Sequence, residues 1–169
     1  TPIARARVEL GERETNAGVA EHRNGVGRSG PVRLARNSKL VDQLGPDDLL
    51  TLVRFDDVAR TVIGPLAVTD RDQFKQSIRT LSATAGTCIE CGLRTGFTEL
   101  HRNLDETRSA RAFLLTDAIP NVKGTRPNDF LPLLKAEADQ GVAVTSFGVG
   151  LDFGQELTTA IQNVRGWWS

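Results

Sequence analysis

Short apolar runs alternate with helical periodicities from about residue 49 onward. Three of the runs predict buried strands: Leu49–Phe55 (LLTLVRF), Arg111–Thr116 (RAFLLT) and Val142–Gly148 (VAVTSFG). Val62-Ile63 predicts a short edge strand that ends at Gly64-Pro65, because proline cannot donate a hydrogen bond within a sheet. Strands interleaved with helices in this way predict an α/β fold with a mostly parallel sheet.

Apolar residues at three- and four-residue spacing predict the helices between and after these strands. In chain order, the expected inner faces are Phe74, Ile78 and Leu81; Leu93, Phe97, Leu100 and Leu104; Phe130, Leu134 and Ala138; and Phe153, Leu157, Ile161 and Val164. Asp70 is the expected cap of the first helix and Asn128 of the third, which places Pro132 in a first turn. Gly141 and Gly166 are expected to end the last two helices.

The first third of the chain has a weaker pattern. Ala4–Leu10 (ARARVEL) alternates weakly and can form a strand, whereas Gly25–Gly30 is typical of a flexible loop. Val32–Leu44 predicts a helix that leads into a turn at Gly45. We therefore divide the chain into a poorly defined N-terminal segment, residues 1–30, and a main domain, residues 31–169.

Length and charge exclude several classes of protein. A chain of 169 residues is long enough for one continuous core and short for two. Its 21 basic residues are balanced by 21 acidic residues and scattered among them, which argues against binding of nucleic acid. No apolar run approaches the ~20 residues that cross a bilayer, and the N-terminus lacks a secretory signal pattern. We expect a soluble domain, which can belong to a longer protein.

Cys88-x-x-Cys91 leaves two interpretations open. A thiolate near a helix N-terminus is stabilised by the helix dipole, which suits a redox pair. A zinc site would need two more ligands, and neither His22 nor His101 has a suitable spacing to the cysteines. Buried or semi-buried thiols are the simpler interpretation, because the surroundings are not those of a thioredoxin-like site.

Motifs of other enzyme classes are incomplete. Gly148-x-Gly150 follows a predicted strand, but Phe153 stands where a dinucleotide-binding turn needs its third glycine. A tight strand-to-helix turn explains these residues better. The sequence contains no Gly-x-Ser-x-Gly and no phosphate-binding loop, so the pattern does not favour a hydrolase or a nucleotidase.

A set of short motifs occurs in a fixed order along the chain. They are Leu44-Gly45-Pro46-Asp47-Asp48, LLTLVRF with Asp56-Asp57, Gly86-Thr87, Leu114-Leu115-Thr116-Asp117 and Phe147-Gly148-Val149-Gly150. In this order and spacing, the chain resembles the von Willebrand factor A family from about Val32 to Gly166. The resemblance implies a Rossmann-like three-layer sandwich with helices on both faces of the sheet. Because Trp167-Trp168 stand where the family continues into a last edge strand, that strand is expected to be missing.

Three segments indicate a closer resemblance within the family. Asp117–Asn121 (DAIPN), Gly148–Phe153 (GVGLDF) and Val164–Gly166 are similar to bacterial domains grouped with calcium-activated chloride channel-like proteins.

The resemblance also implies a metal-ion-dependent adhesion site. In the family, a divalent cation is held by an Asp-x-Ser-x-Ser after the first strand, a Thr before the second amphipathic helix and an Asp after the central strand. Thr87 and Asp117 match the Thr and the Asp. Such hard oxygen ligands suit Mg²⁺, and an open coordination position can accept a carboxylate from a partner protein.

The first of these three loops has no match, since the sequence contains no Asp-x-Ser-x-Ser. Counting back from the turn at Gly45 gives two alternatives. In Glu14–Gly18 (ETNAG), Glu14 and Asn16 offer oxygens to the cation or its waters. In Glu21–Gly25 (EHRNG), Arg23 has no lone pair to give. The first alternative is chemically better, so Thr87, Asp117, Glu14 and Asn16 are the predicted metal ligands of an incomplete site.

The expected function is that of a non-enzymatic module that binds another protein. Mg²⁺, Ca²⁺ or Mn²⁺ is expected to bind weakly or not at all, because both serine ligands are missing. The alternative is a small-molecule-binding or thiol-redox α/β enzyme that uses Cys88 and Cys91.

Overall fold

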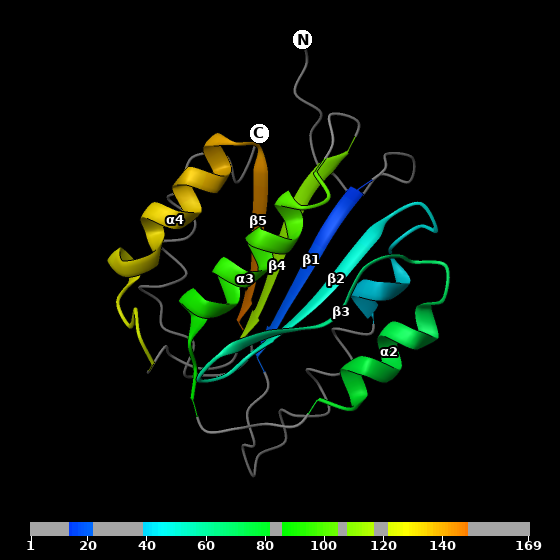
Figure 1. Ribbon diagram of the computed structural model, residues 1–169, viewed down its shortest axis with the longest axis horizontal. Coiled ribbons are helices and arrows are strands. Elements are labelled where there is room, and N and C mark those ends of the chain that lie inside the picture. The colour runs from blue at the N-terminus through cyan, green and yellow to red at the C-terminus, as the bar shows by residue number, and fades with distance from the viewer. Residues whose placement is uncertain (1–13, 22–38, 82–85, 105–107, 117–121, 149–169) are drawn as a thin grey trace.

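A five-stranded sheet forms the centre of the molecule (Figure 1). The computed structural model describes residues 14–21, 39–81, 86–104, 108–116 and 122–148. The strands are β1 (Glu14–Glu21), β2 (Leu49–Phe55), β3 (Ala59–Ala67), β4 (Ser109–Thr116) and β5 (Val142–Gly148), in the spatial order β3-β2-β1-β4-β5. All neighbours pair in parallel except β3, which is antiparallel to β2. The predicted mostly parallel sheet is confirmed.

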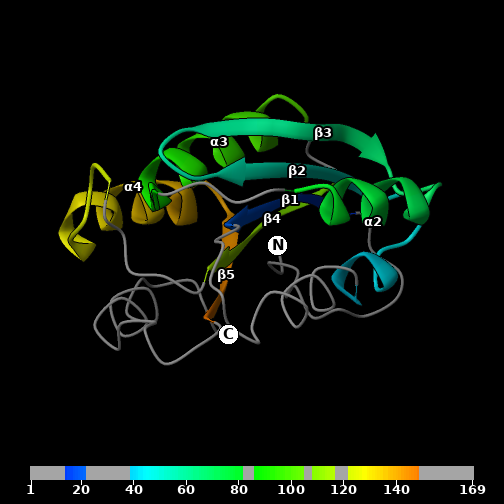
Figure 2. The same cartoon turned by 90° about the horizontal axis from the view of Figure 1, so that it is seen from below.

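Helices cover both faces of this sheet, as Figure 2 shows. On one face, α3 (Ile89–His101) and α4 (Pro127–Asp139) pack against alternate residues of β2, β4 and β5. On the other face, α2 (Arg71–Arg79) and a helical turn at residues 39–42 enclose a second core with Leu50 and Leu52 of β2. Two cores on opposite faces make the three-layer arrangement that the resemblance implied. None of the described helices combines the length and the apolar character needed to cross a membrane.

The strands with strong apolar runs occur where the sequence predicts them. β2 and β5 have the predicted bounds, and β4 begins two residues earlier than predicted, at Ser109. Leu50 and Leu52 of β2 face the second core, whereas Val53 and Phe55 belong to the first. This alternation is what a strand buried on both faces requires.

The central strand β1 was not predicted. It lies between β2 and β4, although its sequence, ETNAGVAE, has only small residues and one valine as its apolar residues. The strand predicted at Ala4–Leu10, the loop predicted at residues 25–30 and the last helix predicted over residues 153–164 lie outside the described residues. β1 therefore falls within the N-terminal segment of residues 1–30, but later in that segment than Ala4–Leu10.

The edge strand β3 is longer than predicted. Val62 and Ile63 belong to an edge strand, as expected, but the strand continues through Gly64-Pro65 to Ala67. The pairing with β2 shifts register between Leu50 and Leu52, and Gly64 has a positive φ of 100° at this irregularity. An edge strand tolerates proline at such a bulge, because the missing N–H is not needed by a second neighbour.

The inner faces of the helices agree with the periodicity, except at some ends. Phe74, Ile78, Leu93, Phe97, Leu100, Phe130 and Leu134 are buried, and Ala138 is partly buried against the first core. Leu104 is 38% exposed, because α3 ends at His101 before reaching it. Gly141 follows α4 with a φ of 84°, as expected of a glycine that ends a helix.

The predicted start of α4 was wrong by two residues. Arg126, not Asn128, is the N-cap, and its backbone N–H donates to Asp129 Oδ2 at 2.9 Å. Pro127 occupies the first helical position, where a missing N–H costs nothing. Pro132 consequently lies inside the helix, with its ring exposed, and not in the first turn.

Replacing Asp70 by alanine should destabilise the protein by about 1 kcal/mol. Asp70 Oδ1 accepts the backbone N–H groups of Asp72 at 3.0 Å and Gln73 at 3.1 Å, so it caps α2 as predicted. The loss can be measured by urea denaturation of Asp70→Ala beside Asp70→Asn, which keeps the capping oxygen. Equal losses in the two variants would contradict this role of the side chain.

Candidate functional site

The carboxyl ends of the parallel strands meet at one edge of the sheet. Glu21, the last residue of β1, pairs with Phe55, the last residue of β2. Leu115 of β4 pairs with Ala20 of β1, so β4 ends at the same edge. The chain adds β2 and β3 on one side of β1 and then β4 and β5 on the other, so the strand order reverses between β1 and β4. In open α/β sheets, the loops next to such a reversal diverge, and ligands bind in the crevice between them.

Thr87 lies at this edge and is fully buried, with 0% of its surface exposed. Its neighbour Cys88 donates its backbone N–H to the carbonyl of Asp56, directly after β2, at 2.7 Å. The carbonyl of Thr87 accepts the N–H of Val122 at 3.4 Å, and Val122 belongs to the connection that follows β4. The segment before α3 is therefore hydrogen-bonded to the residue that follows β2 and to the connection that follows β4.

Asp117 follows Thr116, the last residue of β4, in the sequence, and it lies outside the described residues. Its position directly after β4 is the one that the sequence analysis assigned to it. Its role as a metal ligand stays a prediction.

Glu14 and Asn16, the other two predicted metal ligands, lie away from this edge and are not brought close to Thr87. Glu14 begins β1 and pairs with Ser109, the first residue of β4. With a rise of about 3.3 Å per residue, Glu14 lies roughly 23 Å and Asn16 roughly 17 Å along β1 from the strand's carboxyl end. No side chain spans that distance. Counting back from the turn at Gly45 reaches residues within β1, because the count makes no use of where this strand ends.

The other alignment has the position that a metal loop requires. Because β1 ends at Glu21, the segment Glu21–Gly25 begins where the strand gives way to its loop. Residues 22–25 lie outside the described residues. In this alignment, the positions of the aspartate and the two serines hold Glu21, Arg23 and Gly25.

Two further carboxylates at this edge were not among the predicted site residues. Asp56 is only 6% exposed; its Oδ1 accepts the N–H of Val58 at 3.2 Å and its Oδ2 forms an ion pair with Arg54. The carboxylate of Asp57 lies so close to Gly86 that a Cβ on this glycine would overlap it. Gly86 is thus the residue that lets Asp57 approach the Thr87 segment. Asp56 and Asp57 could have been found from the sequence, because they directly follow the predicted strand Leu49–Phe55.

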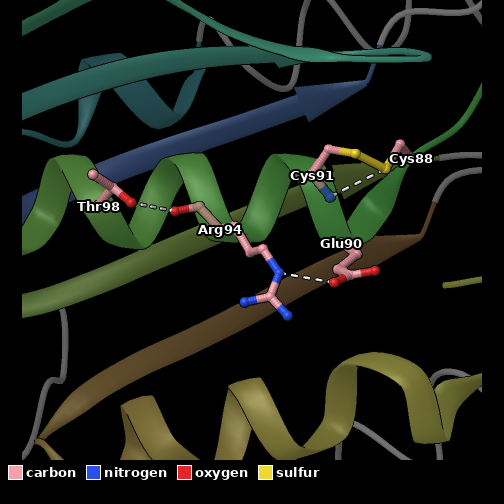
Figure 3. Close-up of polar contacts among 5 residues, drawn as sticks. All are labelled: Cys88, Glu90, Cys91, Arg94 and Thr98. Atoms are coloured by element: carbon pink, nitrogen blue, oxygen red, sulfur yellow. Dashed lines mark hydrogen bonds and ion pairs between the residues drawn. A yellow bond between two sulfur atoms is a disulfide. The ribbon is translucent and has the colours of Figure 1, made fainter. Parts of the chain in front are cut away.

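The first turn of α3 contains a disulfide between Cys88 and Cys91, drawn in Figure 3. The simpler interpretation of the sequence, two thiols, was therefore wrong for this pair. Cys88 is fully buried and is the N-cap of α3, with its Sγ accepting the N–H of Cys91 at 3.2 Å. On the outer side of the same turn, Arg94 Nε donates to Glu90 Oε1 at 2.8 Å.

The ligand chemistry of this edge suits a hard cation better than a soft one. Within the described residues, no group of three or more histidine, cysteine, aspartate or glutamate side chains could hold a metal ion. The oxygen-bearing side chains at this edge are Thr87 and the carboxylates that follow β2. Such a set fits Mg²⁺ or Mn²⁺ with several waters retained, and does not fit a structural zinc site.

Comparison with known proteins identifies the family. The family model for the von Willebrand factor type A domain matches residues 32–119. A curated relative, the uncharacterized protein sll0103 of Synechocystis, is 33% identical over 122 residues, which are 72% of this chain and 28% of that protein. The chain belongs to the von Willebrand factor type A domain family.

Solved structures of the family have the same fold. Proximal thread matrix protein 1 from the mussel byssus, with a zinc-occupied metal-ion-dependent adhesion motif, is 25% identical and has a TM-score of 0.73 over 92% of this chain and 40% of that one. Manganese-loaded TRAP protein of Plasmodium vivax is 17% identical, with a TM-score of 0.74 over 91% of this chain and 64% of its own. The chain thus spans less than a third of the Synechocystis relative and two fifths of the mussel protein.

Proposed function

We propose that this von Willebrand factor type A domain is a non-enzymatic module that binds a protein partner through the loops at the carboxyl edge of its sheet. The observation that carries the proposal is the position of Thr87, whose segment is hydrogen-bonded to residues following both β2 and β4. A segment held by such hydrogen bonds is partly ordered before a partner binds, which lowers the entropy lost on binding. Asp117, next to the end of β4, is the second residue assigned to this surface.

The proposed surface holds a divalent cation weakly. Thr87 and Asp117 are the residues assigned to the cation, and the carboxylate of Asp57 lies beside the Thr87 segment at Gly86. When bound, Mg²⁺ or Mn²⁺ supplies an open coordination position for a carboxylate of the partner. The serine positions of the family motif hold Arg23 and Gly25 in the alignment that starts at the end of β1. A cation beside Arg23 is disfavoured by repulsion, so we expect affinity well below that of a complete site.

The zinc-occupied mussel protein and the manganese-loaded Plasmodium protein support a divalent cation at this position. The closer resemblance to calcium-activated chloride channel-like domains stays a prediction, and so does the boundary between residues 30 and 31. A small-molecule or redox enzyme is the less favoured alternative, because Cys88 is fully buried and lies within the anchored segment.

Mn²⁺ titration followed by NMR tests the cation site. We expect paramagnetic broadening of the backbone amide signals of Asp57, Thr87 and Asp117, because these residues lie at or next to the carboxyl edge. Asp117→Ala should weaken the apparent Mn²⁺ affinity by about tenfold or more. Glu14→Ala is the matched control, since it removes a carboxylate at the other end of β1.

The outcomes separate the parts of the proposal. Equal weakening in Asp117→Ala and Glu14→Ala would contradict the assigned position of the cation. If millimolar Mn²⁺ causes no broadening, the proposed cation site is ruled out and a metal-free binding surface is left. Substitutions at Asp57 and Asp117 would then test that surface in partner-binding assays.

A further inference from the structure

We propose that the Cys88–Cys91 disulfide is a reversible thiol–disulfide exchange site, and that its redox state sets how firmly the Thr87 segment is held at the carboxyl edge. The disulfide joins the N-cap of α3 to the third residue of the helix. Thr87, assigned above to the binding surface, directly precedes it. The inference concerns the same segment as the proposed function, but its readouts need neither a cation nor a partner.

The two cysteines differ in exposure. Cys88 is 0% exposed, whereas Cys91 is only partly buried on the first turn of α3. A small thiol or a dithiol protein therefore has access to Cys91 and not to Cys88. In exchange reactions, the attacked sulfur takes the incoming group and the other sulfur leaves as a thiolate. Exposure thus assigns attack to Cys91 and departure to Cys88.

The surroundings of Cys88 stabilise the thiolate that leaves. Its Sγ already accepts the N–H of Cys91 at 3.2 Å, shown as a dashed line in Figure 3. As the N-cap, it lies at the positive end of the dipole of α3, which runs for 13 residues. Both contributions favour negative charge on Cys88 Sγ and speed the cleavage of the disulfide.

The exchange needs two thiol equivalents from a reductant such as glutathione or a protein dithiol. A thiolate of the reductant attacks Cys91 Sγ, the Sγ–Sγ bond breaks, and its electron pair leaves with Cys88. A second reductant thiolate then attacks the reductant's sulfur in the mixed disulfide and releases Cys91. Two protons complete the two cysteine thiols, and the reductant ends as its own disulfide.

Hydrogen bonds connect this bond to the proposed binding surface. The N–H of Cys88 is bonded to Asp56 at 2.7 Å, and the carbonyl of Thr87 accepts from Val122 at 3.4 Å. Gly86 also lies against Val122, because a Cβ added to this glycine would be 2.9 Å from Val122 Cγ2. While the disulfide is intact, the first turn of α3 cannot unwind without moving these anchors. Reduction removes that constraint, so the segment should open more often.

Equilibration in glutathione buffers, followed by alkylation and mass measurement of the full chain, tests the exchange. We expect protein with both cysteines alkylated or neither, in proportions that follow the buffer ratio reversibly. Two results would overturn the proposal. One is a disulfide that resists reduction until the protein unfolds, as a purely structural bond does. The other is a pair that stays reduced and reacts as independent thiols in every buffer.

Amide hydrogen exchange tests the link to the surface. On reduction, exchange at Cys88 and Val122 should rise by about tenfold, because local opening governs these amides. Exchange at the centre of β4 should not change, which excludes global unfolding. Cys91→Ser is the matched control. It cannot form the disulfide, so the amides of Cys88 and Val122 should show the faster hydrogen exchange in oxidising and in reducing buffer. Unchanged exchange at Val122 on reduction of the wild-type chain would contradict the link.

Discussion

Phe55→Ala is expected to lower the free energy of unfolding by about 3–5 kcal/mol. Phe55 is 0% exposed and ends β2 within the core that α3 and α4 cover. Its truncation loses the transfer free energy of the ring and leaves a cavity that the surrounding strands cannot close. Phe55 directly precedes Asp56, whose carbonyl anchors Cys88, so the loss should extend to the proposed binding surface.

Urea denaturation of Phe55→Ala, Phe55→Leu and Val58→Ala separates the cost of the cavity from the other effects of substitution. Phe55→Leu retains most of the volume and should cost less than half as much as Phe55→Ala. Val58→Ala, at a side chain that is 48% exposed, should change stability by no more than about 0.5 kcal/mol. A loss of under about 1.5 kcal/mol for Phe55→Ala would show that this end of the core repacks freely.

The sequence predicted the elements whose pattern is set by burial alone. β2 and β5 are short apolar runs, and both strands have the predicted bounds. Phe74 and Ile78 fall on the inner face of α2, and Asp70 caps it, because helical spacing and capping chemistry are local properties. These features need no knowledge of the neighbouring elements.

β1 could not be predicted for the opposite reason. Its strand conformation depends on pairing with β2 and β4 on its two sides, and a sequence such as ETNAGVAE carries no local sign of either. The error passed to the site, because the metal loop was positioned by counting residues and not by the end of a strand. Glu14 and Asn16, which that count reached, lie toward the other end of β1. Thr87 lies at the carboxyl edge, where the sequence placed it, because the apolar face of α3 fixes where the preceding loop lies.

The disulfide was missed because spacing does not distinguish its two states. A disulfide needs the two Cα atoms close together, and the cap and third position of α3 hold those of Cys88 and Cys91 5.3 Å apart. The sequence places the pair near a helix N-terminus but does not fix which residue caps the helix. The capping role of Cys88 makes the pair both a structural element and a redox site.

Gly64→Ala is expected to cost about 2–5 kcal/mol of stability. The φ of 100° at Gly64 is one that L-residues rarely adopt. A Cβ there would overlap the carbonyl oxygen of Leu50 and lie 2.8 Å from the Cα of Thr51. Because both neighbours are backbone atoms of β2, no side-chain rotation relieves the overlap, and β3 must move away from the sheet.

Gly141→Ala separates conformational strain from overlap. Gly141 also has a positive φ, 84°, but nothing lies within 4 Å of the position of an added Cβ. Gly141→Ala should lower the stability only by the strain of a left-handed alanine, about 1–2 kcal/mol. The excess loss in Gly64→Ala, measured by urea denaturation of both variants, then reports the close approach of β3 to β2. Equal losses would mean that the edge strand yields without cost, and that the bulge at Gly64 does not hold β3 in register.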